Sequence, residues 1–467
     1  MSIRTVRSPK LSLFQSLVDD YVLGARPHER TSRRRPTLDH PTVHAAAAVA
    51  ERLHRGEPVH RLPPPPELAS SGAAATAWEC TKVAAALFLA RLEGRRDEAV
   101  RLEDELKYGT CDPGWLDVMA VYEEHYGLPG HHRVPYVTYQ AMDDFVLDVL
   151  PRDATIALIG DWGTGTEEAV DLLGQVARKR PDVLVHLGDI YYSGTARETH
   201  SHFLALCDEV LDRRNRPVPI YTMSGNHDMY SGGRGFYELL PLLNPAPPFD
   251  PGYAQRASYF CLRTHDRSWQ LLAMDTGLHD HDPFSVASDV TFLEDREARW
   301  HLDKIGSFAE RGGKTILLSH HQLFSPFEYI GSGTTKPPGK EAYNPKLLDT
   351  FAADLAAGRV AAWFWGHEHN LGIYEPYGPL VRGRCIGHSA IPVYESNGPY
   401  VVNPRIPDPP ALVSGSDGRP VELPLDAHGV YGHGYVILRF DGAARTAEAS
   451  YYLTSDEERP VYSEVIT

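Results

Sequence analysis

The sequence is poor in cysteine and has no long apolar run. Five cysteines are scattered over 467 residues, an odd number that predicts no disulfide framework. No run of 18 apolar residues exists, so no membrane span is expected. The N-terminal residues 1–24 have no continuous apolar core of signal-peptide length. These absences predict a cytoplasmic protein that does not associate with membranes.

Positive charge is also scarce. The chain has 46 Lys and Arg residues against 62 Asp and Glu residues, which gives a net charge of −16. This balance argues against a nucleic-acid scaffold or an anionic membrane as a partner. The basic run at 30–35 (RTSRRR) is a local exception, which we interpret as a solvated segment. A phosphate-bearing substrate would therefore be attracted by a local site rather than by the field of the whole protein.

Several common catalytic motifs are missing. The chain has no GxSxG nucleophile elbow, no GxxxxGK[ST] phosphate loop and no CxxC pair. The glycine-rich SGGRGF at 231–236 does not follow a predicted strand, so we interpret it as a loop and not as a nucleotide-binding turn. The function must reside in other residues.

Five short blocks with metal-ligand residues occur in order along the chain. They are GDWG at 160–163, GDIYY at 188–192, GNHD at 225–228, SHH at 319–321 and GHEH at 366–369. Each follows an apolar run that predicts a buried strand. Ligands at strand ends converge on one edge of a sheet, where α/β proteins place their sites. Carboxylates, imidazoles and an amide suit two cations, and two cations suit phosphoryl-ester hydrolysis.

The blocks resemble the calcineurin-like metallophosphoesterases and, within them, the purple acid phosphatases. That subgroup has the patterns DxG, GDxxY, GNH[DE], xxxH and GHxH, all of which are present. Tyr192, three positions after Asp189, is the discriminating residue. The resemblance covers roughly residues 152–455. It implies an α/β fold of the α+β kind, a four-layer αββα sandwich of two mixed sheets flanked by helices.

The resemblance also implies a ligand set for two metal ions. The first ion would be held by Asp161, Asp189, Tyr192 and His369, and the second by Asp189, Asn226, His320 and His367. Asp189 is also the only carboxylate in its block, which makes it the natural bridge. The two histidines of GHEH are two positions apart and would diverge in an extended strand. We therefore expect a turn there, which the flanking Gly366 would permit.

The expected ions are Fe(III) with a divalent Fe, Zn or Mn ion, or alternatively two divalent ions, Mn or Zn. A site with Fe(III), a divalent ion and a tyrosinate has the same formal charge as a site with two divalent ions and no tyrosinate. Both sites would therefore attract phosphate. A harder Lewis acid lowers the pKa of bound water further, so a ligating Tyr192 predicts activity on the acid side. If Tyr192 only packs in a loop, a colourless pair of divalent ions is expected.

Three residues beside the ligands are candidates for catalysis. His227 follows the ligand Asn226 and is the best candidate for the general acid, with Asp228 able to orient or charge it. His321 would either contact the substrate or satisfy a backbone carbonyl. Outside this set, we interpret His186 as a core histidine and Asp275 as a turn residue. Glu368 is expected to point out of the site, and His388 is a weak substrate-side candidate.

The chain is expected to have two parts. Residues 1–151 would form an α-helical N-terminal region with a proline-rich connector near 59–72, and 152–467 would form the catalytic domain. Gly94 would separate two helices, and 139–150 would be an amphipathic helix. After 151, helices are predicted at 167–180, 197–213, 291–310 and 345–357. The N-terminal region would either pack on the catalytic domain or bind a protein partner.

The most direct functional interpretation is hydrolysis of phosphomonoesters by a metal-bound hydroxide, with a small-molecule or protein phosphate ester as substrate. A phosphodiesterase acting on nucleotides or lipid head groups on the same scaffold is the nearest alternative, because specificity resides in loops. A non-catalytic protein that senses phosphate is the alternative from another class. The intact ligand set with His227 favours an enzyme over that third possibility.

Overall fold

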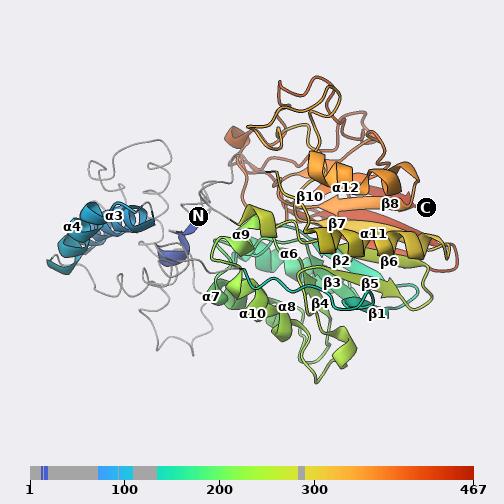
Figure 1. The fold of residues 1–467 in the computed structure, drawn as a ribbon, viewed down its shortest axis with the longest axis horizontal. Coiled ribbons are helices and arrows are strands. Elements are labelled where there is room, and N and C mark those ends of the chain that lie inside the picture. The colour runs from blue at the N-terminus through green and yellow to red at the C-terminus, as the bar shows by residue number, and fades with distance from the viewer. Residues whose placement is uncertain (1–11, 14, 19–71, 93, 109–133, 282–289) are drawn as a thin grey trace. The chain divides into compact units, whose positions relative to one another are not determined.

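The computed structural model describes residues 12–13, 15–18, 72–92, 94–108, 134–281 and 290–467 (Figure 1). The chain divides into two compact units, residues 1–134 with 230–232, and residues 135–229 with 233–467. Apart from its last residue, the predicted proline-rich connector lies outside the described residues. Within the described residues, no helix combines the length and hydrophobicity that a membrane span requires.

The first unit contains two described helices of some length, α3 (Gly72–Leu92) and α4 (Arg96–Tyr108). They contact each other across Gly94, whose φ of 69° confirms the predicted break between two helices. Residues 12–13 and 15–18 are also helical, within the N-terminal region that was expected to be α-helical. Cys80 forms a disulfide, which the cysteine pattern did not predict.

The second unit is built on two mixed sheets (Figure 1). The seven-stranded sheet has the order β1-β5-β6-β7-β8-β10-β9, and the six-stranded sheet has the order β13-β12-β11-β2-β3-β4. The first sheet comprises β1 (Val146–Leu150), β5 (Phe260–Thr264), β6 (Trp269–Ala273), β7 (Lys314–Ser319), β8 (Val360–Trp365), β9 (Leu371–Ile373) and β10 (Gly383–Ile386). The second comprises β2 (Thr155–Ile159), β3 (Val183–His186), β4 (Ile220–Thr222), β11 (Gly434–Asp441), β12 (Thr446–Leu453) and β13 (Tyr462–Ile466).

Helices flank both sheets. The helix α6 (Glu167–Arg178) packs against β11 and α8 (Ala205–Val210), and α10 (Arg234–Leu243) packs against β4. On the other sheet, α11 (Asp295–Ala309) packs against β7 and α12 (Pro345–Ala356). Short helical segments complete the unit: α7 (Ala196–Glu198), η3 (Thr199–Leu204), α9 (Asn226–Met229), η4 (Pro251–Tyr253), η5 (Leu278–Asp280) and η6 (Glu395–Asn397). These positions confirm the helices predicted after residue 151.

Local sequence explains why these helices form. In α6, the buried residues recur at helical spacing and include Ala169, Leu172, Leu173 and Val176. The side chain of Thr166 accepts a hydrogen bond from the backbone N–H of Ala169 and caps the first turn. Side chains of both sheets belong to one continuous apolar core. The predicted sandwich of two mixed sheets flanked by helices is therefore confirmed.

One predicted helix is wrong. Residues 146–150 form β1, which pairs in parallel with β5, with Val146 opposite Cys261. The spacing of the apolar residues in this segment is compatible with a helix and with a strand. The hydrogen-bonded pairing with β5 makes it a strand. The compact unit that contains the sheets begins at Pro135, so the observed division falls earlier in the chain than residue 151.

Candidate metal centre

The ends of five strands supply the predicted ligands. Asp161 follows β2, Asp189 follows β3 and Asn226 opens the short helix after β4, all from the six-stranded sheet. His320 directly follows β7, and His367 follows β8, both from the seven-stranded sheet. The strands β2, β3 and β4 are parallel to one another, as are β7 and β8. Their carboxyl ends therefore bring the ligands together where the two sheets meet.

The first group of donors is formed by Asp161, Asp189 and His369, whose ligand atoms lie within 4.8 Å of one another. His369 Nε2 lies 3.3 Å from Asp161 Oδ1. The hydroxyl of Tyr191 lies between these groups, 3.1 Å from Asp161 Oδ1, 3.0 Å from Asp189 Oδ2 and 3.0 Å from His369 Nε2. Two carboxylates, an imidazole and a phenol thus face one point.

The second group contains the histidines His320, His321 and His367. Asn226 Oδ1 lies 3.0 Å from His320 Nε2 and 3.1 Å from His367 Nδ1. Asp189 Oδ1 lies 3.4 Å from His320 Nε2, while its other oxygen faces Tyr191 in the first group. Asp189 therefore presents one oxygen to each group of donors.

The charge states of these residues suit cations. Burial lowers the pKa of His320 and His367, and lowers that of His321 to about 4, so the three imidazoles are neutral and offer lone pairs. Burial, with the neighbouring charge of Asp189, raises the pKa of Asp161 to about 7. Two buried carboxylates beside neutral imidazoles leave negative charge that a bound cation would neutralise. The donor set therefore fits two metal ions.

Three of the ligands have left-handed backbone conformations. The φ angles are 56° at Asp161, 71° at Asp189 and 68° at His367. A non-glycine residue in this region costs roughly 1–3 kcal/mol and marks places where function demands a particular geometry. The turn in GHEH is thus made by His367 itself. Gly366 permits this turn through its lack of a Cβ atom and not through a positive φ.

Glycines beside the ligands are needed for close approach. A Cβ atom on Gly366 would lie 2.5 Å from Asp161 Oδ2, and one on Gly225 would lie 2.1 Å from Asp189 Oδ1. Both distances are far below a van der Waals contact, so any larger residue would displace a carboxylate. These two glycines therefore allow the blocks to pack against one another.

The tyrosine whose hydroxyl faces the first group is Tyr191, whereas the GDxxY pattern predicted Tyr192. Two hydrogen bonds of Tyr192 are made by its backbone. Its N–H donates to Glu198 Oε1 at 2.7 Å, and its carbonyl lies 2.6 Å from His227 Nδ1. Asp189 has a positive φ, and in such a loop the number of positions from Asp189 does not tell which tyrosine side chain faces the donors. Two adjacent tyrosines in the block were the only available signal.

His227 lies at the accessible side of the centre. Its side chain is 16% exposed, whereas that of Asp189 is 1% exposed. The Nδ1 position donates to the carbonyl of Tyr192, which directs Nε2 inward to 4.0 Å from Asp189 Oδ2. The ring also packs against that of Tyr191, with centroids 4.5 Å apart. This placement suits a residue that exchanges a proton with a ligand bound at the centre.

Asp228 has a different role from the predicted one. Its carboxylate is fully buried and accepts hydrogen bonds from the backbone N–H groups of Asp189 at 2.8 Å, Ile190 at 3.1 Å and Gly225 at 2.7 Å. It thereby fixes two ligand-bearing loops to each other. The group that orients His227 is the carbonyl of Tyr192, and the hydrogen bonds of Asp228 are those of a positioning residue.

His321 lies beside the second group, with its ring 4.4 Å from that of His367. Its Nδ1 lies 3.1 Å from Thr276 Oγ1, and its Nε2 lies 3.1 Å from Asp280 Oδ2. Both ring nitrogens of His321 thus contact side chains, and neither contacts a backbone carbonyl as one of the two predicted alternatives required. Thr276 and Asp280 were not foreseen, because only the fold brings the end of β6 beside β7.

The remaining candidates lie outside the ligand groups. His186 is fully buried and contacts Thr222 Oγ1, and Asp275 accepts from the backbone of Leu278, which agrees with the predicted core and turn roles. Glu368 was expected to point out of the site; it is half-buried and belongs to neither donor group, and desolvation raises the pKa of its carboxyl to about 8. Its carboxylate accepts a hydrogen bond from Ser325. His388 is buried as well.

Residues 154–371 match the family model of the calcineurin-like phosphoesterases. No curated protein matches the sequence. Among solved structures, a dimetal phosphatase from Danio rerio is similar at 13% identity, with a TM-score of 0.40 and coverage of 68% of this chain and 99% of that chain. GAP50, the anchor in the inner membrane complex of Plasmodium, is similar at 13% identity, with a TM-score of 0.39 and coverage of 68% and 89%. Similarities at this level indicate nothing about activity.

Proposed function

The chain contains a calcineurin-like phosphoesterase domain at residues 154–371, and from that premise we propose that it hydrolyses phosphate monoesters at a binuclear metal centre of the purple acid phosphatase type. The observation that carries the proposal is the convergence of six predicted ligands in two groups that share Asp189. The ligands come from both sheets and have neutral imidazoles and buried carboxylates, as hard or borderline cations require.

Each residue of the chain then has a defined task. Two bound cations would supply Lewis acidity and an activated water. Asp189 would hold both cations. Asp228 would keep the loops that carry Asp189 and Asn226 in fixed positions relative to each other. His227, held through Nδ1 by the carbonyl of Tyr192, would deliver a proton from Nε2 to the leaving oxygen. His321, paired with Asp280, would line the substrate side of the second group.

We propose Fe(III) with divalent Fe, Zn or Mn as the ion pair if a tyrosinate ligates, and two Mn or Zn ions otherwise. The position of the Tyr191 hydroxyl supports the first choice and moves the expected ligand from Tyr192 to Tyr191. A phenolate bound to Fe(III) would give the protein a visible absorption band.

Replacing Tyr191 with phenylalanine is expected to abolish the visible absorption band of the iron-reconstituted protein. Tyr192→Phe is the matched control and is expected to keep the band, because the hydroxyl that faces Asp161 and Asp189 is that of Tyr191. Absorption spectroscopy with iron quantification checks this. A band lost only in Tyr192→Phe would return the ligand role to Tyr192, and a colourless wild-type protein with bound iron would favour the divalent pair.

The activity test compares a chromogenic phosphomonoester with the corresponding diester, using protein reconstituted with iron, manganese or zinc. We expect the monoester to react faster by at least about tenfold, which corresponds to about 1.4 kcal/mol in barrier height. A preference for the diester would change the assignment to phosphodiesterase. Phosphate binding without turnover of either ester would instead favour a phosphate-sensing protein, and chelator-treated protein provides the blank.

Partners and location complete the proposal. Small-molecule or protein phosphate esters are the proposed substrates, and a protein partner for the helical N-terminal region is proposed alongside them. Cytoplasmic location also stays a proposal, and the disulfide at Cys80 weighs against it, because stable disulfides form mainly in oxidising compartments.

A further inference from the structure

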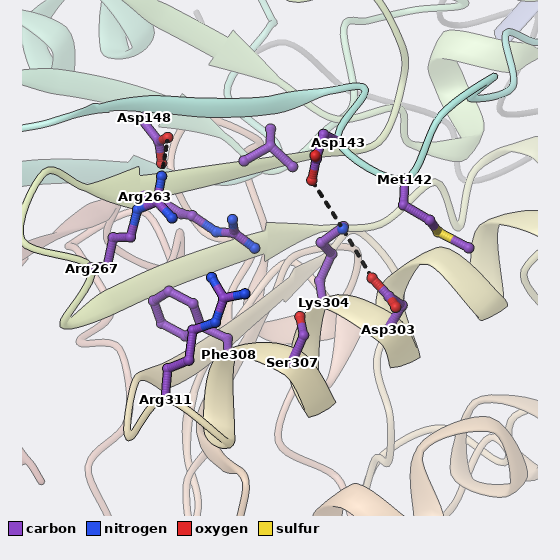
Figure 2. Close-up of a pocket in the computed structure, with 11 residues that line it drawn as sticks. Met142, Asp143, Asp148, Arg263, Arg267, Asp303, Lys304, Ser307, Phe308 and Arg311 are labelled. Atoms are coloured by element: carbon purple, nitrogen blue, oxygen red, sulfur yellow. Dashed lines mark hydrogen bonds and ion pairs between the residues drawn. The ribbon is translucent and has the colours of Figure 1, made fainter.

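A cavity of about 560 Å³ lies in the unit of residues 135–229 and 233–467, between α11, the edge strand β1 and its neighbour β5 (Figure 2). It lies far from the metal centre along the strand direction. Arg267 precedes the start of β6, whereas Thr276, beyond the end of β6, contacts His321. Likewise Arg311 precedes β7, and His320 follows it. The cavity and the metal centre are therefore at opposite ends of the same sheet.

Four cationic side chains line this cavity: Arg263 from β5, Arg267 from the turn after it, Lys304 from α11 and Arg311 from the turn after α11 (Figure 2). Three acidic residues, Asp143, Asp148 and Asp303, also line it. The lining therefore has a positive excess in a protein whose net charge is −16. Such a local reversal of sign is a site where an anion would be favoured.

The acidic residues engage only two of the four cations. Arg267 pairs with Asp148 at 3.3 Å, and Lys304 Nζ lies 3.0 Å from Asp303 and 3.9 Å from Asp143. Across the described parts of the chain, neither Arg263 nor Arg311 forms an ion pair. Two guanidinium groups at the cavity are thus available to an anion from outside.

Arg263 is the more informative of the two. It is only 8% exposed, and its Nε donates to the neutral side-chain oxygen of Gln270 at 3.1 Å. Its guanidinium carbon lies 5.1 Å from the ring centroid of Phe308. A buried cation without an anionic partner is unfavourable, and a bound anion would offset that cost. Phe308, together with Val146 and Met142, also gives the cavity an apolar wall.

We propose that this cavity is a binding site for a small organic anion, with a phosphate or carboxylate group held by Arg263 and Arg311 and an apolar or aromatic body against Phe308. Guanidinium groups bind both anions through paired N–H donors. The volume is in the range of small-molecule sites, so the cavity accommodates more than an inorganic ion. The site is independent of the ester hydrolysis proposed above.

The test is calorimetric titration of the full-length protein with phenylphosphonate, which is not an ester, with phenylacetate, and with inorganic phosphate. Arg311→Glu is expected to weaken binding of at least one aromatic anion by about tenfold or more, because it removes a charge-assisted contact. Arg311 is exposed, so this change is not expected to disturb folding. The ratio between phosphonate and carboxylate affinities then identifies the anionic group.

The matched control is Arg299→Glu, the same charge change at an exposed position of α11 that does not line the cavity. The same titrations in Asn226→Ala protein separate binding at the metal centre from binding at the cavity. Equal weakening by Arg299→Glu and Arg311→Glu would reduce the effect to overall charge and overturn the proposal. Binding that is lost in Asn226→Ala but kept in Arg311→Glu would place the anion at the metal centre and overturn it too.

Discussion

Replacing Asn226 with alanine is expected to lower phosphoesterase activity by about a thousandfold. The amide oxygen of Asn226 lies 3.0 Å from His320 Nε2 and 3.1 Å from His367 Nδ1, in a side chain that is 4% exposed. It is the one neutral oxygen donor of the second group, so alanine would leave an incomplete set of ligands. A bound cation contributes several kcal/mol to the stabilisation of the transition state, and each 1.4 kcal/mol corresponds to a factor of ten.

The metal content separates this effect from a general loss of structure. Elemental analysis of Asn226→Ala should show loss of one of the two ions, with the first group retained. Asn226→Asp keeps an oxygen donor and should recover part of the activity. Asn215→Ala, at an exposed position away from the centre, is the control and should behave as wild type. Wild-type metal content and rate in Asn226→Ala would reject the binuclear centre.

Replacing His227 with glutamine is expected to slow hydrolysis of an alkyl phosphate by about a hundredfold to ten-thousandfold, the usual contribution of a positioned proton donor. A nitrophenyl ester should lose far less, because its leaving group departs without a proton. His227 suits this role because its Nδ1 is held by a carbonyl while its Nε2 faces the centre. The readout is kcat for both esters, measured with metal content.

His200→Gln is the matched control, because that histidine is exposed on η3. It should leave both rates unchanged. An equal loss on the alkyl and nitrophenyl esters in His227→Gln, at unchanged metal content, would show that His227 does not donate the proton. A raised KM with unchanged kcat would assign it to phosphate binding instead.

The sequence predicted much of the fold because the strands that carry the ligands are buried and strongly patterned. The segment 360–365 is a continuous apolar run, and 314–319 has an apolar centre at 316–318. A polar block that directly follows such a buried strand is expected at the edge of the sheet. The proximity of Asp161, Asp189, Asn226, His320 and His367 follows from that rule. Their binding of metal stays a prediction.

Other features depend on information that periodicity does not contain. The choice between Tyr191 and Tyr192 depends on backbone angles in a loop, where side chains do not alternate. The role of Asp228 required the knowledge that three backbone N–H groups from two loops point at one carboxylate. The cavity beside Arg263 exists only because the end of α11 packs near β5. Such tertiary contacts are not visible in local sequence.

The origin of the ligands in both sheets also bears on the order of folding. Asp161 Oδ2 accepts a hydrogen bond from the backbone N–H of His367 at 2.8 Å, a contact between residues 206 positions apart. Contacts of such long sequence separation require the closure of large loops and form slowly. Neither sheet alone presents both groups of donors, so a chain interrupted between β4 and β7 would contain only half a centre. During refolding, enzymatic activity should therefore be among the last properties to return, after the secondary structure and compactness of each sheet have been regained.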